Sequence, residues 1–266
     1  MRAPGAVASR RAPGTGSVPE ADAPPYLDIL GIQVLAATTL EAVRLIDRRC
    51  GADKPLGIAF LNAHGSNLAA RDPGFTGVLR QMLVLNDGVG VDVAARILAG
   101  RGFPENLNGT DFLPAFLTGT AQEHRLFLLG GRPGVAERAA AVITEGHPRH
   151  RVIGTRDGYF DPSETEAVVE EIRASGATLL LVALGNPAQE LWIARHLVAT
   201  GVSVAFGVGA LFDFLAGKVS RAPALVRRVR LEWAWRLILE PKRLFRRYVL
   251  GNPLFLLRVV RKRLIG

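Results

Sequence analysis

The chain has 266 residues, of which 48% are hydrophobic and 21% charged, and its formal net charge is +9 at pH 7. This length and composition predict a mainly globular protein, either one large domain or a domain with an appendage. The single cysteine, Cys50, excludes an internal disulfide and is typical of a reducing compartment. No stretch reaches the roughly 18 uninterrupted apolar residues of a membrane-spanning helix, and residues 1–25 lack the apolar segment of a secretory signal.

The positive charge is concentrated at the carboxyl end of the chain. From Lys218 to Gly266 there are fourteen Lys and Arg residues and two Glu residues, a net charge of +12. The rest of the chain has nineteen basic and twenty-two acidic residues, a net charge of −3. A basic tail attached to a domain of nearly balanced charge indicates an anionic partner for the tail.

The pattern of apolar residues predicts three segments. Residues 1–25 are rich in Ala, Pro, Gly and Arg, so we expect them to be disordered. Residues 26–217 alternate strands with helices, which predicts an α/β fold with a doubly wound, mainly parallel, Rossmann-like sheet. Residues 218–266 are predicted to form a basic, amphipathic helical appendage.

Within the α/β body, the elements are predicted in chain order from apolar periodicity and from start and stop signals. We expect strands within 27–36, at 56–61, ending at 85, and at 125–129, 152–153, 178–184 and 202–208. We expect helices at about 40–50, 90–99, 110–122, 135–145, 164–174 and 189–199.

Glycine or a polar side chain comes directly after most of these strands, at Asn62 and within 86–90, 130–134, 185–190 and 207–209. Open α/β sheets bind ligands at the carboxyl edge of their strands, and glycine-rich turns before helices offer N–H donors to phosphate. We interpret these turns as a nucleotide or diphosphate site that includes Asp87. The alternative is ordinary turn chemistry, in which Asp87 caps the following helix. A P-loop and a GxGxxG motif are both absent, so an ATPase or a dinucleotide enzyme is poorly supported.

The appendage interleaves basic and large apolar residues. Residues 224–240 have the spacing of an amphipathic helix, Pro241 starts a second segment, and 251–253 is expected to break the chain again before 254–265. Basic helices that carry Trp, Phe and Leu bind at the surface of anionic membranes. A helical hairpin packed on the core and a nucleic-acid-binding tail are the alternatives. The apolar content favours the membrane over nucleic acid.

The motifs together resemble those of the WecG/TagA/CpsF glycosyltransferases, glycosyltransferase family 26. The matching motifs are collinear from about Tyr26 to Tyr248 and include NDGVG at 86–90, NGTD at 108–111, GGRPGVA at 130–136, GYF at 158–160, LGNPAQE at 184–190, FDFLAG at 212–217, RAP at 221–223, LEWAWRL at 231–237 and EPKR at 240–243. The resemblance implies a membrane-associated cytoplasmic enzyme that transfers a sugar from a UDP-sugar to a polyprenyl-diphosphate-linked saccharide. It also implies inversion of the anomeric centre without a metal or other cofactor.

The resemblance assigns roles to individual residues. The base falls on Asp87, which could take the proton of the acceptor hydroxyl. A glutamine suited to hydrogen-bonding the sugar or the acceptor falls on Gln189, and the arginines implicated in holding the diphosphate fall on Arg236, Arg243 and Arg246. Further substrate-binding residues are expected at Asn62, Asn108, Gly109, Thr110, Asp111, Gly130, Gly131, Tyr159, Gly185, Asn186 and Glu190. Whether Tyr159 and Phe160 stack on uracil or pack in the core is left open.

Two departures from the family pattern leave the donor sugar open. Phe60 replaces a threonine, and Asn106 replaces a frequent arginine. UDP-glucose, UDP-N-acetylmannosamine and its uronic acid all remain candidates. His64 has no second His or Cys at ligand spacing, so no metal site is expected.

Two other classes of function keep part of the pattern. A nucleotide-binding regulator would need the turns but not Asp87, and a basic nucleic-acid-binding adaptor would need mainly the tail. The preferred partners are a UDP-sugar, a lipid-linked acceptor and the anionic inner leaflet of the plasma membrane, with no nucleic acid. The sequence leaves open whether the chain forms a homo-oligomer.

Overall fold

The computed structural model describes residues 24–50, 54–218, 222–223, 226 and 232–265. Of residues 232, 236 and 243 it describes the backbone but not the side chain. The predicted disordered segment 1–25 therefore lies almost wholly outside the described residues.

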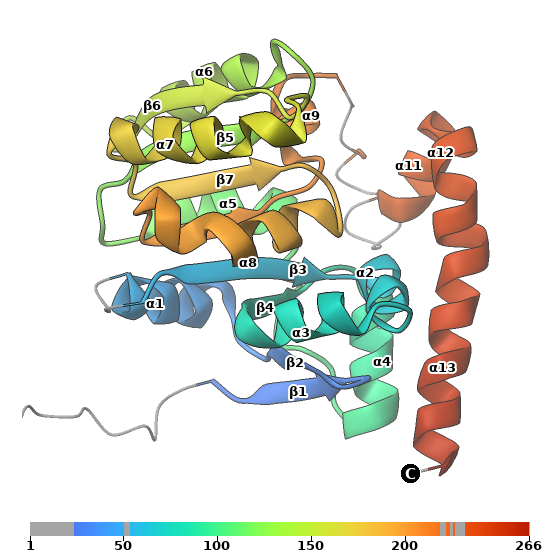
Figure 1. The fold of residues 1–266 in the computed structure, drawn as a ribbon. Coiled ribbons are helices and arrows are strands. Elements are labelled where there is room, and N and C mark those ends of the chain that lie inside the picture. Colours follow the sequence, from blue (N-terminus) through green and yellow to red (C-terminus); the bar gives the residue numbers. More distant parts are fainter. Residues whose placement is uncertain (1–23, 51–53, 219–221, 224–225, 227–231, 266) are drawn as a thin grey trace, which may run out of the picture.

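A six-stranded parallel sheet forms the centre of the molecule (Figure 1). The strands lie in the order β4-β3-β8-β7-β5-β6, and each neighbouring pair is parallel. Their bounds are β3 (Leu56–Leu61), β4 (Leu83–Asn86), β5 (Arg125–Gly130), β6 (Arg151–Arg156), β7 (Leu179–Ala183) and β8 (Val204–Gly207). The chain builds outward through β3 and β4, crosses to β5 and β6, and returns through β7 and β8 to fill the centre. This order confirms the predicted doubly wound α/β class.

The strands are almost continuously apolar because helices cover both faces of the sheet. Successive residues of a strand point to opposite faces. Ile58 and Phe60 of β3 therefore join one hydrophobic core, whereas Ala59 and Leu61 join another.

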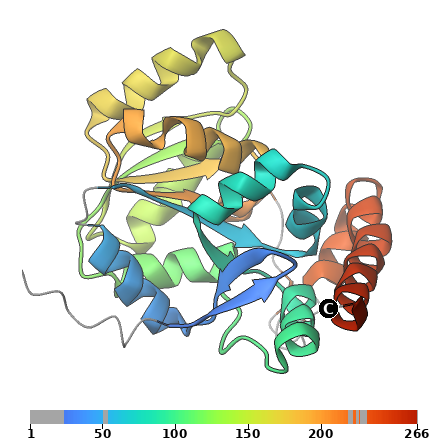
Figure 2. The same ribbon diagram turned by 60° about the horizontal axis from the view of Figure 1, so that its bottom comes forward.

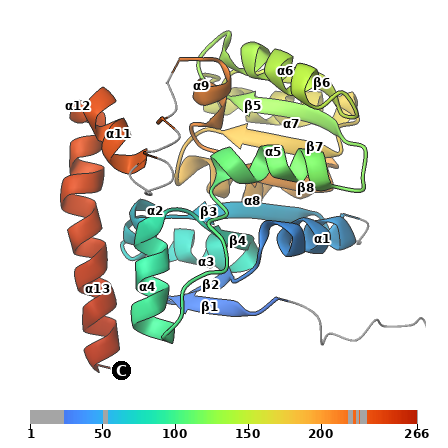
Figure 3. The same ribbon diagram turned by 180° about the vertical axis from the view of Figure 1, so that it is seen from behind.

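Each face of the sheet has its own set of helices. The face seen in Figure 1 is covered by α3 (Pro73–Gln81), α7 (Thr165–Ser175) and α8 (Ala188–Thr200). The face seen in Figure 3 is covered by α1 (Thr39–Arg49), α5 (Gly109–Gly119) and α6 (Val135–Gly146). The short helix α9 (Leu211–Leu215) packs with α6, and the turn η2 (Pro162–Glu164) precedes α7. An antiparallel hairpin, β1 (Tyr26–Ile29) with β2 (Ile32–Leu35), lies against β4.

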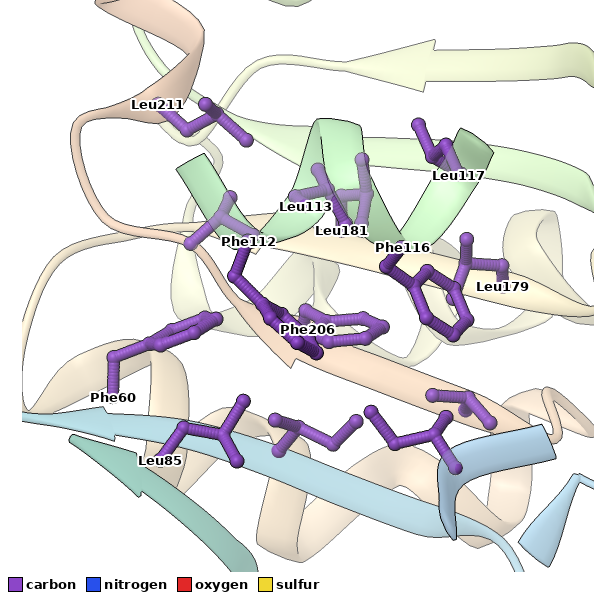
Figure 4. Close-up of a cluster of buried hydrophobic side chains, with 14 of the residues drawn as sticks. Phe60, Leu85, Phe112, Leu113, Phe116, Leu117, Leu179, Leu181, Phe206 and Leu211 are labelled. Carbon is purple, nitrogen blue, oxygen red and sulfur yellow. The ribbon is translucent and has the colours of Figure 1, made fainter. Parts of the chain in front are cut away.

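An aromatic cluster fills the core beneath α5 (Figure 4). Phe116 of α5 lies 5.2 Å from Phe206 of β8, centroid to centroid, and Phe60 of β3 lies 6.3 Å from Phe112. Such ring pairs add a favourable term of about 1 kcal/mol to the burial of apolar area. The cluster holds α5 against β3 and β8, and so fixes the loop that enters α5.

The two helices between β3 and β4 were not predicted from the sequence. The helix α2 (Ala63–Ala69) follows β3 and has Asn62 as its N-cap, and α3 has Asp72 as its N-cap with Pro73 at its first position. Three glycines lie within these two helices and lower their helix propensity, which hides the pattern. Asp72 and Pro73 were nevertheless readable start signals. Strand β6 is also longer than the expected 152–153. Its residues are at most half-buried at the edge of the sheet, so the apolar pattern that predicts a strand is weak there.

The carboxyl-terminal segment is helical through the position where a break was predicted. It comprises α11 (Glu232–Leu239), α12 (Pro241–Phe245), the π-helical turn η3 (Arg246–Leu250) and α13 (Gly251–Ile265). The break predicted at 251–253 is wrong. Pro253 lies in the first turn of α13, directly after the wide π turn, where its missing N–H does not interrupt the helix.

The last helix, α13, packs on the α/β body (Figures 1 and 2). It lies against α2 and α4 (Val89–Ala99), and its residues Phe255 and Val259 are fully buried in the same core as β1, β2 and α4. Among the described residues, no helix is both long and apolar enough to cross a membrane.

Candidate active site

A cavity of ≈ 880 Å³ opens at the carboxyl edge of the parallel sheet. The turns that follow all six strands contribute to its wall, as the doubly wound order requires. The predicted site residues that line it are Asn62, Asp87, Asn108, Gly109, Thr110, Asp111, Gly131, Tyr159, Gly185, Asn186 and Gln189. The structure therefore brings most of the predicted site into one place.

Asp87 lies on the turn between β4 and α4. Its backbone N–H donates to the carbonyl oxygen of Leu61 at 2.8 Å, which ties the turn to the end of β3. The N-cap of α4 is Gly88, with φ +88°, and no side chain caps this helix. The alternative in which Asp87 merely caps the following helix is therefore wrong. Its carboxylate belongs to the cavity wall instead.

Asn62 holds the Asp87 carboxylate from the neighbouring strand. The Asn62 side-chain amide Nδ2 donates to Asp87 Oδ2 at 3.0 Å, and its Oδ1 accepts from the Gly65 backbone N–H at 3.0 Å. The same side chain thus caps α2 and fixes one carboxylate oxygen of Asp87. Leu61 and Asn86 pair across β3 and β4, so the two strands end side by side.

The loop that enters α5 supplies a second polar wall. Asn108 caps α5, since its Oδ1 accepts from the Asp111 backbone N–H at 3.1 Å and its Nδ2 donates to Asp111 Oδ2 at 2.8 Å. Asn106 also lines the cavity, and its Oδ1 accepts from the Gly88 backbone N–H at 2.8 Å. This contact ties the loop to the turn that carries Asp87.

Gln189 joins the turns that follow β7 and β8. Its Oε1 accepts from the backbone N–H of Gly185 at 3.2 Å and from that of Gly209 at 3.0 Å. Its Nε2 donates to Glu190 Oε1 at 2.8 Å, and the Asn186 amide donates to the same oxygen. Gln189 is only 2% exposed, so it borders the cavity mainly as a clamp between two loops.

Glu190 lies behind the cavity rather than in its wall. The side chain is fully buried, and burial raises its pKa to about 7, with the hydrogen bonds from Gln189 and Asn186 acting in the opposite direction. Its Oε2 finds no hydrogen-bond partner among the described residues. Glu190 was predicted to bind substrate, and the structure places it one layer further in.

The turns after β5 and β6 form the opposite wall. Gly131, Arg132, Gly158 and Tyr159 line the cavity there, and the Tyr159 side chain is 71% exposed at its rim. Phe160 packs instead toward the core, with the Arg156 guanidinium 5.9 Å above its ring. The predicted site residue Gly130 is not in the wall.

Gly130 has a packing role. A Cβ at this position would lie 2.5 Å from the backbone of Ala183, and the residue has φ +128°. Only glycine fits so close to the neighbouring strand in this conformation. The absence of a side chain at Gly130 lets the ends of β5 and β7 lie close together.

The carboxyl-terminal segment forms the last wall. Trp233, Leu244, Arg247, Tyr248 and Asn252 line the cavity, and the Trp233 and Tyr248 rings meet edge to face at 6.1 Å. The Arg247 guanidinium lies 5.6 Å from the centre of the Tyr248 ring.

The predicted arginines are only partly placed. Arg246 is exposed and is not in the cavity wall. The side chains of Arg236 and Arg243 lie outside what the structure describes. Arg247 was not predicted, because the arginine positions were taken from the resemblance to the family and not from helical spacing. The π turn at this point also shifts the helical phase by about one residue, which a regular helical pattern does not show.

His64 is a further wall residue without a predicted role. It lies in the first turn of α2, and burial together with the nearby Arg247 charge lowers its pKa to about 4. The imidazole is therefore neutral at pH 7, and Arg247 supplies the positive charge on this side of the cavity. Asp213 of α9 is a further carboxylate in the wall, beside Asp87 and Asp111, and had no predicted role. Within the described part of the chain, no cluster of three or more His, Cys, Asp or Glu side chains could hold a metal ion.

Carboxylates, several amides and two arginines line a cavity at the carboxyl edge of a doubly wound sheet, which is where α/β enzymes bind their ligands. The model of the glycosyl transferase WecG/TagA/CpsF family matches residues 27–266, nearly the whole chain. The chain belongs to this family, and it is a glycosyltransferase of cell-surface polymer synthesis. The match includes α13, so the last helix is part of the family's chain.

Proposed function

We propose that this enzyme transfers a sugar from a UDP-sugar to a polyprenyl-diphosphate-linked saccharide, with Asp87 as the general base. The observation that supports this role is the geometry of the Asp87 side chain. Its carboxylate lies in the cavity wall, does not cap α4, and has one oxygen fixed by Asn62. The proposal also rests on the membership of the family.

The chemistry is a single displacement at the anomeric carbon. Asp87 takes the proton of the acceptor hydroxyl through Oδ1, since Oδ2 is held by Asn62. The hydroxyl oxygen forms the new glycosidic bond while the bond between the anomeric carbon and the UDP oxygen breaks, and its electron pair stays on UDP. Attack from the face opposite the leaving group inverts the anomeric configuration.

Two walls are suited to the two diphosphates of the reaction. The turn with Gly131 and Arg132 brings a guanidinium and the start of α6 to the cavity, which suits UDP. Arg247 takes the role that the sequence analysis gave to Arg246. Its Nε is buried and finds no hydrogen-bond partner among the described residues, so we assign it to the diphosphate of the acceptor.

The outer surface of the carboxyl-terminal segment supports attachment to a membrane surface. Large apolar side chains are exposed there, namely Ile238 (74%), Leu257 (66%), Leu264 (80%) and Ile265 (74%). Exposed basic residues accompany them at Lys242, Arg246, Lys262 and Arg263. This combination binds anionic bilayers peripherally. The polyprenyl acceptor is confined to the bilayer, so the wall that carries Arg247 would face its diphosphate.

The proposed reaction can be tested by measuring UDP release from full-length enzyme. UDP-glucose, UDP-N-acetylmannosamine and its uronic acid would be offered singly, with and without a short-chain polyprenyl-diphosphate saccharide in detergent. We expect one donor to give acceptor-dependent UDP release and a product whose mass increases by one sugar. UDP binding without release for every donor and acceptor would favour the nucleotide-binding regulator.

A further inference from the structure

The helix α13 lies against the two helices that begin at the candidate catalytic residues. Its buried residues Phe255 and Val259 pack in the core that also contains Ala63 of α2 and Val91 of α4. A Cβ placed on Gly90 would come within 3.9 Å of the Phe255 ring. Helix α2 starts directly after Asn62, and α4 starts two residues after Asp87. Helix α13 therefore contacts both of the helices that follow the Asn62–Asp87 pair.

Polar contacts fasten the carboxyl end of α2 to α13. Arg258 Nη1 donates to the Ser66 carbonyl oxygen at 3.1 Å and to Asn67 Oδ1 at 2.9 Å. Asn67 Nδ2 in turn donates to the Gly251 carbonyl oxygen at 2.7 Å. Asn67 is 8% exposed, and these bonds span more than 180 residues of sequence.

The opposite end of α2 reaches Asp87. The helix has only seven residues, so a shift at Ser66 and Asn67 is passed to its first turn with little loss. The first turn is capped by Asn62, whose amide nitrogen holds Asp87 Oδ2. The contacts thus run from Arg258 through α2 and Asn62 to the carboxylate.

We infer that Arg258 and Asn67 are positioning residues, which set the orientation of the Asp87 carboxylate by fastening α2 to α13. This inference rests on the proposed function, because it assumes that the orientation of Asp87 controls sugar transfer. An apolar side chain would be sufficient if α13 only covered the core, since removing a guanidinium from water is costly. Arg258 is half-buried against α2, whereas Arg261 on the same helix is exposed.

Comparing the matched variants Arg258→Met and Arg261→Met separates an effect of positioning Asp87 from an effect of removing a positive charge from α13. Both changes remove one positive charge from α13 and keep a long unbranched side chain. In detergent with a short-chain acceptor, we expect R258M to lower kcat at least tenfold while the KM of the UDP-sugar stays within twofold. We expect R261M to keep both constants within twofold, and Arg258→Lys to give an intermediate kcat. An R258M enzyme with a lowered melting temperature but an unchanged kcat would overturn the inference.

A double-mutant cycle with Asn62→Ala tests the route of the effect. If Arg258 acts through Asn62, R258M has little further effect on kcat once the Asn62 amide is gone. We therefore expect the double variant to be within about threefold of N62A alone. Losses that multiply across the two sites would show that Arg258 does not act through Asn62, and would overturn the inference.

Amide hydrogen exchange gives a readout that does not depend on sugar transfer. We expect R258M, but not R261M, to speed exchange at Gly65, which bonds to Asn62, and at Asp87, which bonds to Leu61. If wild type transferred no sugar but this difference appeared, the proposed function would fail while the link from α13 to Asp87 would stand. Equal exchange in both variants would overturn the link, whatever the activity.

Discussion

Arg247 lines the cavity, whereas its neighbour Arg246 is exposed to solvent. Both lie in the π-helical turn η3, and only Arg247 is close enough to His64 to lower the pKa of that imidazole. The two side chains carry the same charge in the same turn. They therefore provide a comparison between binding inside the cavity and charge on its outer surface.

The substitution Arg247→Gln should raise the KM of the diphosphate-linked acceptor. A lost charge-assisted hydrogen bond corresponds to about a 10- to 100-fold increase. Arg246→Gln should leave this KM within about twofold, because an exposed charge is largely screened by solvent. Steady-state kinetics with the acceptor as the varied substrate would measure both. Equal KM values for the two variants would remove Arg247 from the acceptor site.

The position of these arginines shows where sequence reasoning reached its limit. A cluster of arginines after Pro241 was predictable as an anion-binding element, and the structure places one of them in the cavity. Which arginine of the cluster faces the cavity was not predictable, since a π turn leaves no mark in apolar periodicity. The packing of α13 against α2 was likewise not predictable from the sequence. The buried apolar residues of α13 are interleaved with basic residues, so the helix reads as a surface element.

The stability of the protein should depend on the protonation of Glu190. Its pKa is raised from 4.5 to about 7, so between these values the folded protein holds a proton that the unfolded chain releases. The corresponding stability is present below pH 4.5 and is lost as the pH rises to 7. Wild type should therefore lose about 3 kcal/mol of unfolding free energy relative to Glu190→Gln between pH 4.5 and 7.

Denaturant unfolding of both proteins at pH 5, 6, 7 and 8 would measure this difference. The comparison with the Gln variant cancels the contribution of all other titrating groups. Parallel stability curves would mean that Glu190 titrates alike in the folded and unfolded chain. That result would contradict the buried, partly unsatisfied carboxyl group described above.

Sugar transfer is expected to persist in EDTA. The diphosphate would be stabilised by arginine side chains and backbone N–H groups at the turns, which supply positive charge without a bound cation. Initial rates with and without chelator, followed by addition of Mg²⁺ or Mn²⁺, would measure this. Loss of transfer in chelator with recovery on adding either cation would contradict the expectation.

The exposed apolar residues of α13 should determine binding to vesicles. Leu257→Gln together with Leu264→Gln removes two apolar side chains from the outer surface and should weaken binding to anionic vesicles at least about tenfold. Val198→Gln is a matched control, because Val198 is 79% exposed but lies on α8. Sedimentation with vesicles would compare the variants. Similar losses for both would indicate a general effect on solubility rather than a membrane-binding surface.

The sheet and the shared site were predictable from a simple relationship. Apolar strands followed by polar or glycine-rich turns must meet at one edge when the strands are parallel, and Asn62, Asp87 and Asn186 do so. Which of the side chains at that edge face the cavity was not predictable. Gln189 and Glu190 are consecutive in sequence, yet one borders the cavity and the other is fully buried behind it. Only the packing of α8 against β7 and β8 decides which side chain faces which layer.

The role of Asp87 as the base is tested most directly by the rate of sugar transfer in Asp87→Asn. The amide keeps the size and turn-forming ability of the carboxylate, so the melting temperature and UDP binding should stay close to wild type. Loss of a general base typically lowers the rate by about 10²- to 10⁴-fold, and we expect kcat at saturating acceptor to fall within this range. An Asn variant that transferred sugar within a few-fold of wild type would contradict the assignment of Asp87 as the base.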